Sequence, residues 1–395
     1  MRPLASRLDV LSGEGALSVY ARAKELERQG RSIIHLELGE PDFHPDVSVL
    51  EAAKKALDEG KDRYCPMAGV PALREELAAY LKRTRSISVD AANIVVAPGC
   101  KTALFFALMA LVEPGDEVLY PDPGFPGYPS IPRGFGAVPV PYDLSEGNHL
   151  QPDPEEVARK ITPRTKVLIT CSPSNPAGSV TSDAVQRRIA ELAVQHDLYV
   201  LSDEIYARIV YEGEYFSMLR YPGMAERTLI IDGFSKSFAM TGWRLGYTVA
   251  PAPIVPHLVM LAINSYTCVA EFVQWAAIAA LRDSNQYTPH MVKQYAARGK
   301  SFAAGLNQIP GFRCLRPEGA FYAWVNVAGT GLSAEEVCRV MLEEGGVAAI
   351  PGAAFGASGR PFVRFSFASS MATLDEAVQR ILKVSSVWQK VPAVR

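Results

Sequence analysis

Short runs of β-branched and other apolar residues alternate with longer segments of helical periodicity through the middle of the chain. NIVVAP, KVLITCSP and LYVLSDEIY are typical of buried strands, and the segments KTALFFALMALVEPGD and SDAVQRRIAELAVQHD have the spacing of helices. This strand and helix order predicts an α/β fold with parallel strands covered by helices on both faces. Polar clusters directly follow the strands, where an open α/β sheet binds its ligands.

The pattern changes after about residue 285. It predicts a long helix near 289–308, a helix near 333–345, a last helix, and the strands AFYAWVNV and FVRFSFA. Seven prolines between residues 121 and 141 indicate a rigid, irregular connection within one domain. We therefore predict a segment at 1–45 that partly joins the small domain, a large domain at 46–284 and a smaller α/β domain at 285–395.

Composition narrows the class of protein. The 40 basic and 42 acidic residues among 395 give a formal charge of −2, which argues against general nucleic-acid or membrane-surface binding. The apolar run at 103–112 is too short to span a bilayer, and the first residues lack the apolar core of a signal peptide. The six cysteines have no C-x-x-C spacing, so no zinc site or disulfide framework is predicted. We predict a cytoplasmic protein that acts on a small molecule.

Several common catalytic motifs are missing from the sequence. There is no H-E-x-x-H and no G-x-S-x-G, and QYAARGKS has glutamine where a P-loop has its first glycine. These observations exclude the zincin, serine hydrolase and P-loop classes.

The stretch GFSKSFAMTGWRLGY at 233–247 holds two cations among apolar residues. Desolvation of Lys236 beside Arg244 would lower the pKa of its amine and make it a nucleophile. The alternative is a solvent-facing lysine in a loop. Arg244, entering an apparently buried strand, suits a phosphate, and its alternative is an internal pair with a carboxylate.

Two glycine-containing turns follow strands. Gly99, Cys100 and Lys101 open a helix whose free N–H groups suit a phosphate, although any strand-to-helix turn can use glycine. Asn175 lies between two prolines in SPSNPAG, which would aim its amide or would form a simple turn.

Three further residues complete a candidate site. Asp203 ends a strand that should be buried, so its carboxylate needs a partner such as a protonated ring nitrogen. Tyr206 could bind the same ligand or pack in the core, and Arg364, in an apolar strand, suits a carboxylate. An amine, phosphate binders, a buried carboxylate and an Asn/Tyr pair together match the chemistry of pyridoxal 5′-phosphate (PLP).

With SKSFAMTGWRLGY, SDEIY and SPSNPAG at these spacings, the chain resembles the class I/II aminotransferases of PLP fold type I over nearly its whole length, from HLELGEPDF to VRFSFA. It is most similar to the subgroup that contains many bacterial aspartate aminotransferases. The resemblance implies a mostly parallel seven-stranded sheet between helices in the large domain, and PLP as cofactor.

The resemblance also implies a role for each matching residue. Lys236 would form the internal aldimine and shuttle the substrate proton, and Asp203 would keep the pyridine nitrogen protonated. The other matches are Asn175 and Tyr206 for the phenolate oxygen; Gly99, Cys100, Lys101, Ser235 and Arg244 for the phosphate; Phe125 for stacking on the ring; and Arg364 with the backbone of Gly39 for the substrate α-carboxylate. Asn175 is also expected to bind the substrate.

Tyr64 matches a tyrosine that reaches the phosphate of the neighbouring subunit's cofactor, which implies a homodimer with shared sites. Three departures stand out: Gly233 replaces a common phosphate-binding serine, SPSNPAG replaces SPNNPTG, and Phe125 lacks a polar group. Lys101 could bind the distal carboxylate of an acidic substrate or lie beside the phosphate.

We therefore expect an aminotransferase of amino acid metabolism that works by a ping-pong cycle on an amino acid and a 2-oxo acid. A β-eliminating carbon–sulfur lyase or a decarboxylating relative is the alternative on the same fold, and a PLP-binding protein without turnover is a third. We expect the substrate side-chain pocket near residues 12–20, 35–44 and 266–272, completed by the partner subunit.

Overall fold

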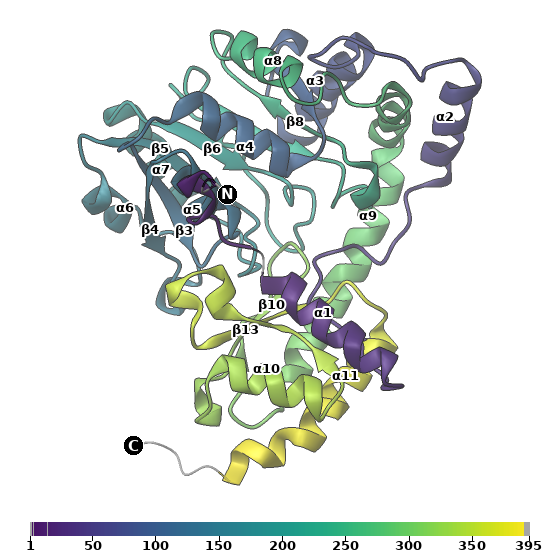
Figure 1. Cartoon of the computed structure of the whole chain (residues 1–395), viewed down its shortest axis with the longest axis vertical. Coiled ribbons are helices and arrows are strands. Elements are labelled where there is room, and N and C mark those ends of the chain that lie inside the picture. The colour runs from purple at the N-terminus through teal and green to yellow at the C-terminus, as the bar shows by residue number, and fades with distance from the viewer. Residues whose placement is uncertain (1, 3, 14, 391–395) are drawn as a thin grey trace.

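The computed structural model describes residues 2, 4–13 and 15–390, which form two sheet-containing bodies connected by one long helix (Figure 1). Residues 1, 3 and 14 of the predicted N-terminal segment and 391–395 of the predicted small domain lie outside the described residues. Within the described part of the chain, no helix combines the length and the hydropathy needed to cross a membrane.

The larger body contains a seven-stranded sheet in the order β2-β8-β7-β6-β5-β3-β4. Only β8 runs antiparallel to its neighbours, and the other strand pairs are parallel. This confirms the predicted mostly parallel sheet. The strands are β2 (Ile94–Ala97), β3 (Glu117–Asp122), β4 (Val138–Asp143), β5 (Thr165–Cys171), β6 (Tyr199–Asp203), β7 (Thr228–Gly233) and β8 (Gly246–Val249).

Helices cover both faces of this sheet because alternate strand residues are apolar on both sides. In β5, Val167 and Ile169 pack in one core, and Leu168 packs in the core on the opposite face. The first core contains α4 (Cys100–Leu111), α5 (Gly127–Gly134) and α8 (Val255–Ile263). The opposite face is covered by α2 (Val47–Asp58), α3 (Pro71–Arg85), α6 (Pro154–Lys160), α7 (Asp183–Gln195) and the first part of α9 (Glu271–Leu306).

The smaller body is built on a four-stranded antiparallel sheet in the order β12-β13-β10-β9, with a separate parallel pair of β1 and β11. Its strands are β1 (Ile34–His35), β9 (Arg313–Cys314), β10 (Tyr322–Asn326), β11 (Val347–Ala348), β12 (Ile350–Pro351) and β13 (Phe362–Ser366), and its helices are α1 (Gly15–Arg28), α10 (Ala334–Glu343) and α11 (Met371–Val384). Through β1, the N-terminal segment pairs with the C-terminal part of the chain.

Polar caps fix where the helices of the smaller body begin. Ser333 Oγ accepts a hydrogen bond from the Glu336 N–H at 3.2 Å, and Ser370 Oγ accepts one from the Thr373 N–H at 3.1 Å. Each cap satisfies a backbone donor that the helix cannot, and contributes about 1 kcal/mol.

Helix α9 differs from the sequence prediction of a helix that starts near residue 289. It begins at Glu271 and continues through Pro289. A proline removes one backbone hydrogen bond, but buried side chains before it pack in the larger body and those after it, such as Phe302, pack in the smaller one. Tertiary packing therefore overrides the local signal. The predicted domain boundary at 284–285 falls inside this helix, and the three-part division remains a prediction.

Gln274 of α9 offers a test of how this helix holds the loop that follows Tyr64. Its Oε1 accepts from the Val70 N–H at 2.8 Å, and its Nε2 donates to the Val269 carbonyl at 2.8 Å. Gln274→Leu should lower the free energy of unfolding by about 1–3 kcal/mol, because it leaves the buried Val70 N–H without a partner and leaves the Val269 carbonyl with the weak Cys65 Sγ donor at 3.5 Å. Urea denaturation measures the change. Gln294→Leu, at an exposed position of the same helix, should change it little, and equal effects would contradict the prediction.

Candidate active site

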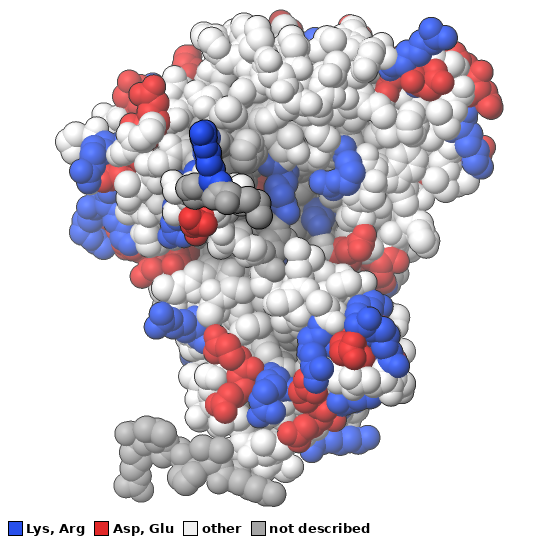
Figure 2. Space-filling view, in the orientation of Figure 1, with Lys and Arg blue, Asp and Glu red and all other residues white. Residues whose placement is uncertain are grey.

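A cavity of about 310 Å³ lies between the carboxyl ends of the central strands and the smaller body. Figure 2 shows it as a hollow between the two parts of the molecule, with basic side chains inside it. Most of the residues predicted from the sequence meet on its wall. These are Gly39, Cys100, Lys101, Phe125, Asn175, Asp203, Tyr206, Ser235, Lys236, Arg244 and Arg364.

Two predicted residues are not on this wall. Gly99 is the N-cap of α4, directly before Cys100. Tyr64 is 85% exposed and lies outside the cavity of its own chain.

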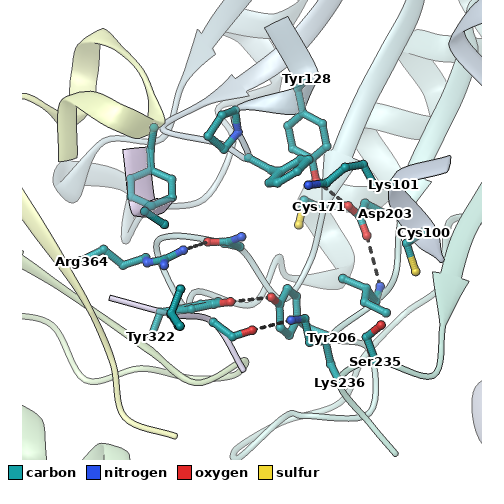
Figure 3. A pocket seen from close by; sticks show the side chains of 18 of the residues that line it. Cys100, Lys101, Tyr128, Cys171, Asp203, Tyr206, Ser235, Lys236, Tyr322 and Arg364 are labelled. Carbon is teal, nitrogen blue, oxygen red and sulfur yellow. Dashed lines mark hydrogen bonds between the residues drawn. The ribbon is translucent and has the colours of Figure 1, made fainter. Parts of the chain in front are cut away.

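Lys236 projects from the turn after β7 to the junction of the two bodies (Figure 3). Its Nζ donates a hydrogen bond to the carbonyl oxygen of Gly39 and lies 5.9 Å from the centre of the Phe321 ring. Burial, together with Arg364 and Arg244, lowers the pKa of Lys236 to about 8 against the opposing effects of Cys100 and Glu40. A substantial fraction of this amine is therefore neutral near pH 8.

Asp203 is the last residue of β6. Its Oδ2 accepts from the Tyr128 hydroxyl at 2.7 Å, and its Oδ1 accepts from the Ile205 N–H at 3.3 Å (Figure 3). Burial raises the pKa of Asp203 to about 6, although these two hydrogen bonds oppose the rise. A buried carboxylate in this state gains from a cationic partner.

An anion cradle forms where α4 begins. Gly99 has a φ of +91°, and a Cβ there would lie 2.4 Å from Nη2 of Arg244. Arg244 is itself left-handed at φ 52°, and its Nη1 donates to the Thr241 carbonyl at 2.9 Å. A helix N-terminus, an arginine and the nearby Ser235 together suit a phosphate group.

No side chain fits at position 233. A Cβ on Gly233 would lie 2.7 Å from Cys100 Sγ and 2.8 Å from the Cα of Gly246. The serine that the family resemblance implies at this position would therefore clash with the start of α4 and with β8.

Arg364 of β13 lies at the opposite side of the cavity (Figure 3). Its Nη1 donates to Asn175 Oδ1 at 3.1 Å and its Nη2 to the Glu37 carbonyl at 2.7 Å. Its guanidinium lies 4.5 Å from the Tyr322 ring centre and 4.6 Å from that of Phe355. This planar cation, held by backbone, amide and rings, suits a carboxylate.

The sequence did not single out two site tyrosines. Tyr128 donates to Asp203, and Tyr322 shares a hydrogen bond of 2.7 Å with Tyr206. Burial raises the pKa of Tyr206, so this hydroxyl stays protonated. Both missed tyrosines lie in apolar surroundings, where sequence alone does not separate a hydrogen-bonding tyrosine from a packed one. Tyr322 also leaves no room for a Cβ at Gly39, which would lie 2.2 Å from its hydroxyl.

Two of the three segments expected around the substrate pocket contribute to the cavity. Gly15, Ala16 and Leu17 line it, as do Leu38 and Gly39. Residues 266–272, all of them described, do not line it. They contribute instead to the cores that contain α8 and α9.

The donor set fits PLP. The amine of Lys236 suits its aldehyde, the carboxyl of Asp203 suits its ring nitrogen, and the cradle at Gly99 and Arg244 has the space and charge for its phosphate.

Comparison with known proteins gives one consistent result. The family model for aminotransferase class I and II matches residues 31–381. An aspartate aminotransferase of Pyrococcus horikoshii is 37% identical over 383 residues, which cover 96% of this chain and 96% of the relative. An aspartate/prephenate aminotransferase of Thermus thermophilus is 39% identical over 390 residues, 97% of this chain and 99% of the relative. The solved structure of the Thermus thermophilus aspartate aminotransferase with maleate is similar with a TM-score of 0.93, at 38% identity, over 97% of this chain and 100% of that one.

The raised pKa of Asp203 has a consequence for stability. An unfolded Asp ionises near pH 3.8 and the folded Asp203 near 6, so the folded state binds this proton more tightly and the free energy of unfolding falls as pH rises between these values. In the cofactor-free protein, Asp203→Asn should raise that free energy by about 2 kcal/mol at pH 7 and have little effect below pH 4. Denaturation at both pH values tests this. Asp375→Asn, at an exposed position of α11, is the control, and a pH-independent difference would contradict the prediction.

Proposed function

Because this chain belongs to the class I and II aminotransferases and is a transaminase, we propose that it binds PLP through Lys236 and transfers an amino group from an amino acid to a 2-oxo acid in a ping-pong cycle. The observation that carries the proposal is the buried amine of Lys236 in one cavity with Asp203 and Arg364. When bound, PLP supplies an electrophilic aldehyde and an electron-withdrawing ring.

Each residue then acts on a stated group. Nζ of Lys236, neutral in part near pH 8, removes the proton from the substrate α-carbon and returns it. The Asp203 carboxylate holds the proton of the ring nitrogen, and Tyr128 holds that carboxylate in place. Asn175 and Tyr206 donate to the phenolic oxygen.

The remaining polar groups bind and orient. Arg244, Ser235 and the N–H groups at Gly99, Cys100 and Lys101 bind the phosphate, and Phe125 stacks on the ring. Arg364, with the backbone of Gly39, binds the substrate α-carboxylate.

The similar proteins favour transamination over the lyase alternative, since both relatives compared above are aminotransferases by name. Arg364 also retains the α-carboxylate, which disfavours decarboxylation. For the substrate side chain, Lys101 lies 5.7 Å from the centre of the Phe125 ring. The cation of Lys101 suits an acidic side chain, in agreement with the aspartate and prephenate in the relatives' names, which are both dicarboxylic acids.

Loss of the lysine tests the function directly. Lys236→Ala should retain no covalent PLP after borohydride reduction, read by mass spectrometry, and should lose at least about 10³-fold in kcat because the acid–base group is gone. Lys300→Ala, at an exposed position of α9, is the control. Amino acids added singly to the parent should change the cofactor absorbance without ammonia release. An active Lys236→Ala enzyme would contradict the assignment, and ammonia release without a 2-oxo acid would favour elimination.

We also propose a cytoplasmic homodimer in which Tyr64 reaches the phosphate in the partner's cavity. Tyr64 is 85% exposed, and α4 and α8 expose the apolar side chains of Phe105, Met109, Met260 and Ile263, a set that suits an interface. All six cysteines are free thiols, which suits a reducing compartment.

Sedimentation should give twice the chain mass. Tyr64→Phe should weaken PLP affinity about tenfold, because it removes one hydrogen bond to a charged phosphate, without changing the dimer. Tyr287→Phe, which loses a hydroxyl bonded within its own chain to the His44 carbonyl, is the control. A monomer with full PLP affinity would contradict this proposal.

A further inference from the structure

A buried ionic cluster lies behind the cavity wall and has no part in the roles above. Arg85, the last residue of α3, places its guanidinium between the carboxylates of Glu204 and Asp232. The side chains of Arg85, Glu204 and Asp232 are 2%, 0% and 5% exposed. Charges so far from water persist only when they are paired and hydrogen-bonded.

Hydroxyl donors reach both carboxylates, and a backbone N–H donor reaches one of them. Glu204 Oε1 accepts from the hydroxyls of Ser202 at 3.1 Å and Ser217 at 2.7 Å. Asp232 accepts from the Tyr247 hydroxyl at 2.7 Å and the Gly233 N–H at 2.6 Å. Burial alone would lower the pKa of Arg85, but Asp232 and Glu204 raise it well above its usual value. The cluster thus contains two anions and one cation.

This cluster is attached to the site through two strands. Glu204 directly follows Asp203 at the end of β6, and its N–H donates to the Ile231 carbonyl of β7 at 2.9 Å. Asp232 precedes the turn that carries Lys236. After burial itself, Asp232 and Glu204 both raise the pKa of Asp203, and Arg85 is the cation that pairs with both of these carboxylates.

We propose that Arg85 is a positioning residue for the reaction: it fixes Glu204 and Asp232 behind Asp203 and balances their charge, so that Asp203 is ionised when the cofactor binds. The inference rests on the proposed PLP function and extends it. Other titratable or charged groups also face these residues. They are Tyr80, Tyr215, Tyr247 and Arg208 around the cluster, and Tyr128, Cys171 and Cys100 around Asp203.

The test uses the full chain freed of PLP and the probe 4-deoxypyridoxine 5′-phosphate. This probe keeps the ring nitrogen, phenol and phosphate but lacks the aldehyde, so it forms no bond to Lys236. Calorimetry gives its dissociation constant from pH 5 to 8 for the parent and for Arg85→Met, Asp232→Asn and Arg83→Met. Ionisation of the probe is common to all four proteins, so differences between their pH profiles report the protein.

Each affinity is compared with the same protein's value at pH 8. In Arg85→Met the three neighbouring carboxyl groups lose their cation and bind protons more tightly as a coupled set, so the loss of affinity at low pH should begin about one pH unit higher than in the parent, about tenfold weaker at pH 6. Asp232→Asn removes one anion, so the loss of affinity for the probe should begin at a lower pH than in the parent. Arg83→Met, two residues earlier at an exposed position of α3, should leave it unchanged.

A profile for Arg85→Met that matches the parent, with only a lower melting temperature, would show a purely structural role and overturn the proposal. Shifts of Arg85→Met and Asp232→Asn in the same direction would overturn it too. If Arg85→Met does not fold, Asp232→Asn carries the test together with Arg85→Lys, which keeps the charge and should keep the parent profile. A parent that does not bind the probe at pH 8 would overturn the proposed function itself, and this inference with it.

Discussion

Burial of the Lys236 amine is the constraint on which the site depends. An ammonium group removed from water is destabilised unless it finds an anion or loses its proton. Here its hydrogen-bond partner is the carbonyl of Gly39; Arg364 and Arg244 oppose its protonation, and Cys100 and Glu40 favour it. The fold therefore places three basic side chains, Lys236, Arg364 and Arg244, around one cavity at the junction of the two bodies. A phosphate and a carboxylate bound at the two arginines would offset their charge, so ligand binding and the chemistry of the amine are coupled by charge.

One short segment connects the groups proposed to bind cofactor and substrate. The Glu37 carbonyl accepts from Arg364, and the Gly39 carbonyl accepts from Lys236. The same segment is anchored to the smaller body, because the Leu36 N–H donates to Ala348 and the Leu36 carbonyl accepts from Ser366. The positions of the amine and the guanidinium are thus set together by the pairing of the N-terminal segment with the C-terminal part of the chain, which a sequence-order view of domains does not anticipate.

The sequence predicted those features that are visible within a short segment, such as a charged residue among apolar ones. A charge in an apolar run is conspicuous, so Lys236, Asp203 and Arg364 could be found, and the strand and helix order followed from periodicity. Features that depend on contacts with residues far away in the sequence could not be predicted. Tyr322 is one aromatic residue among several in an apolar strand, and Arg85 looks like an ordinary cation at a helix C-terminus until its partners on β6 and β7 are known. The early start of α9 was missed for the same reason, since packing on both bodies outweighs the local signal of Pro289.

The close approach of three backbone segments explains how an anion cradle forms without a serine at position 233. Gly233 pairs with Gly246 across β7 and β8, and a Cβ on Gly246 would lie 2.7 Å from the N atom of Cys100. With glycine at both positions, the first turn of α4 packs directly on this strand pair, beside the guanidinium of Arg244. Side chains there would separate the helix N-terminus from the arginine. The proposed phosphate site therefore depends on glycine at these positions as well as on the side chains of Arg244 and Ser235.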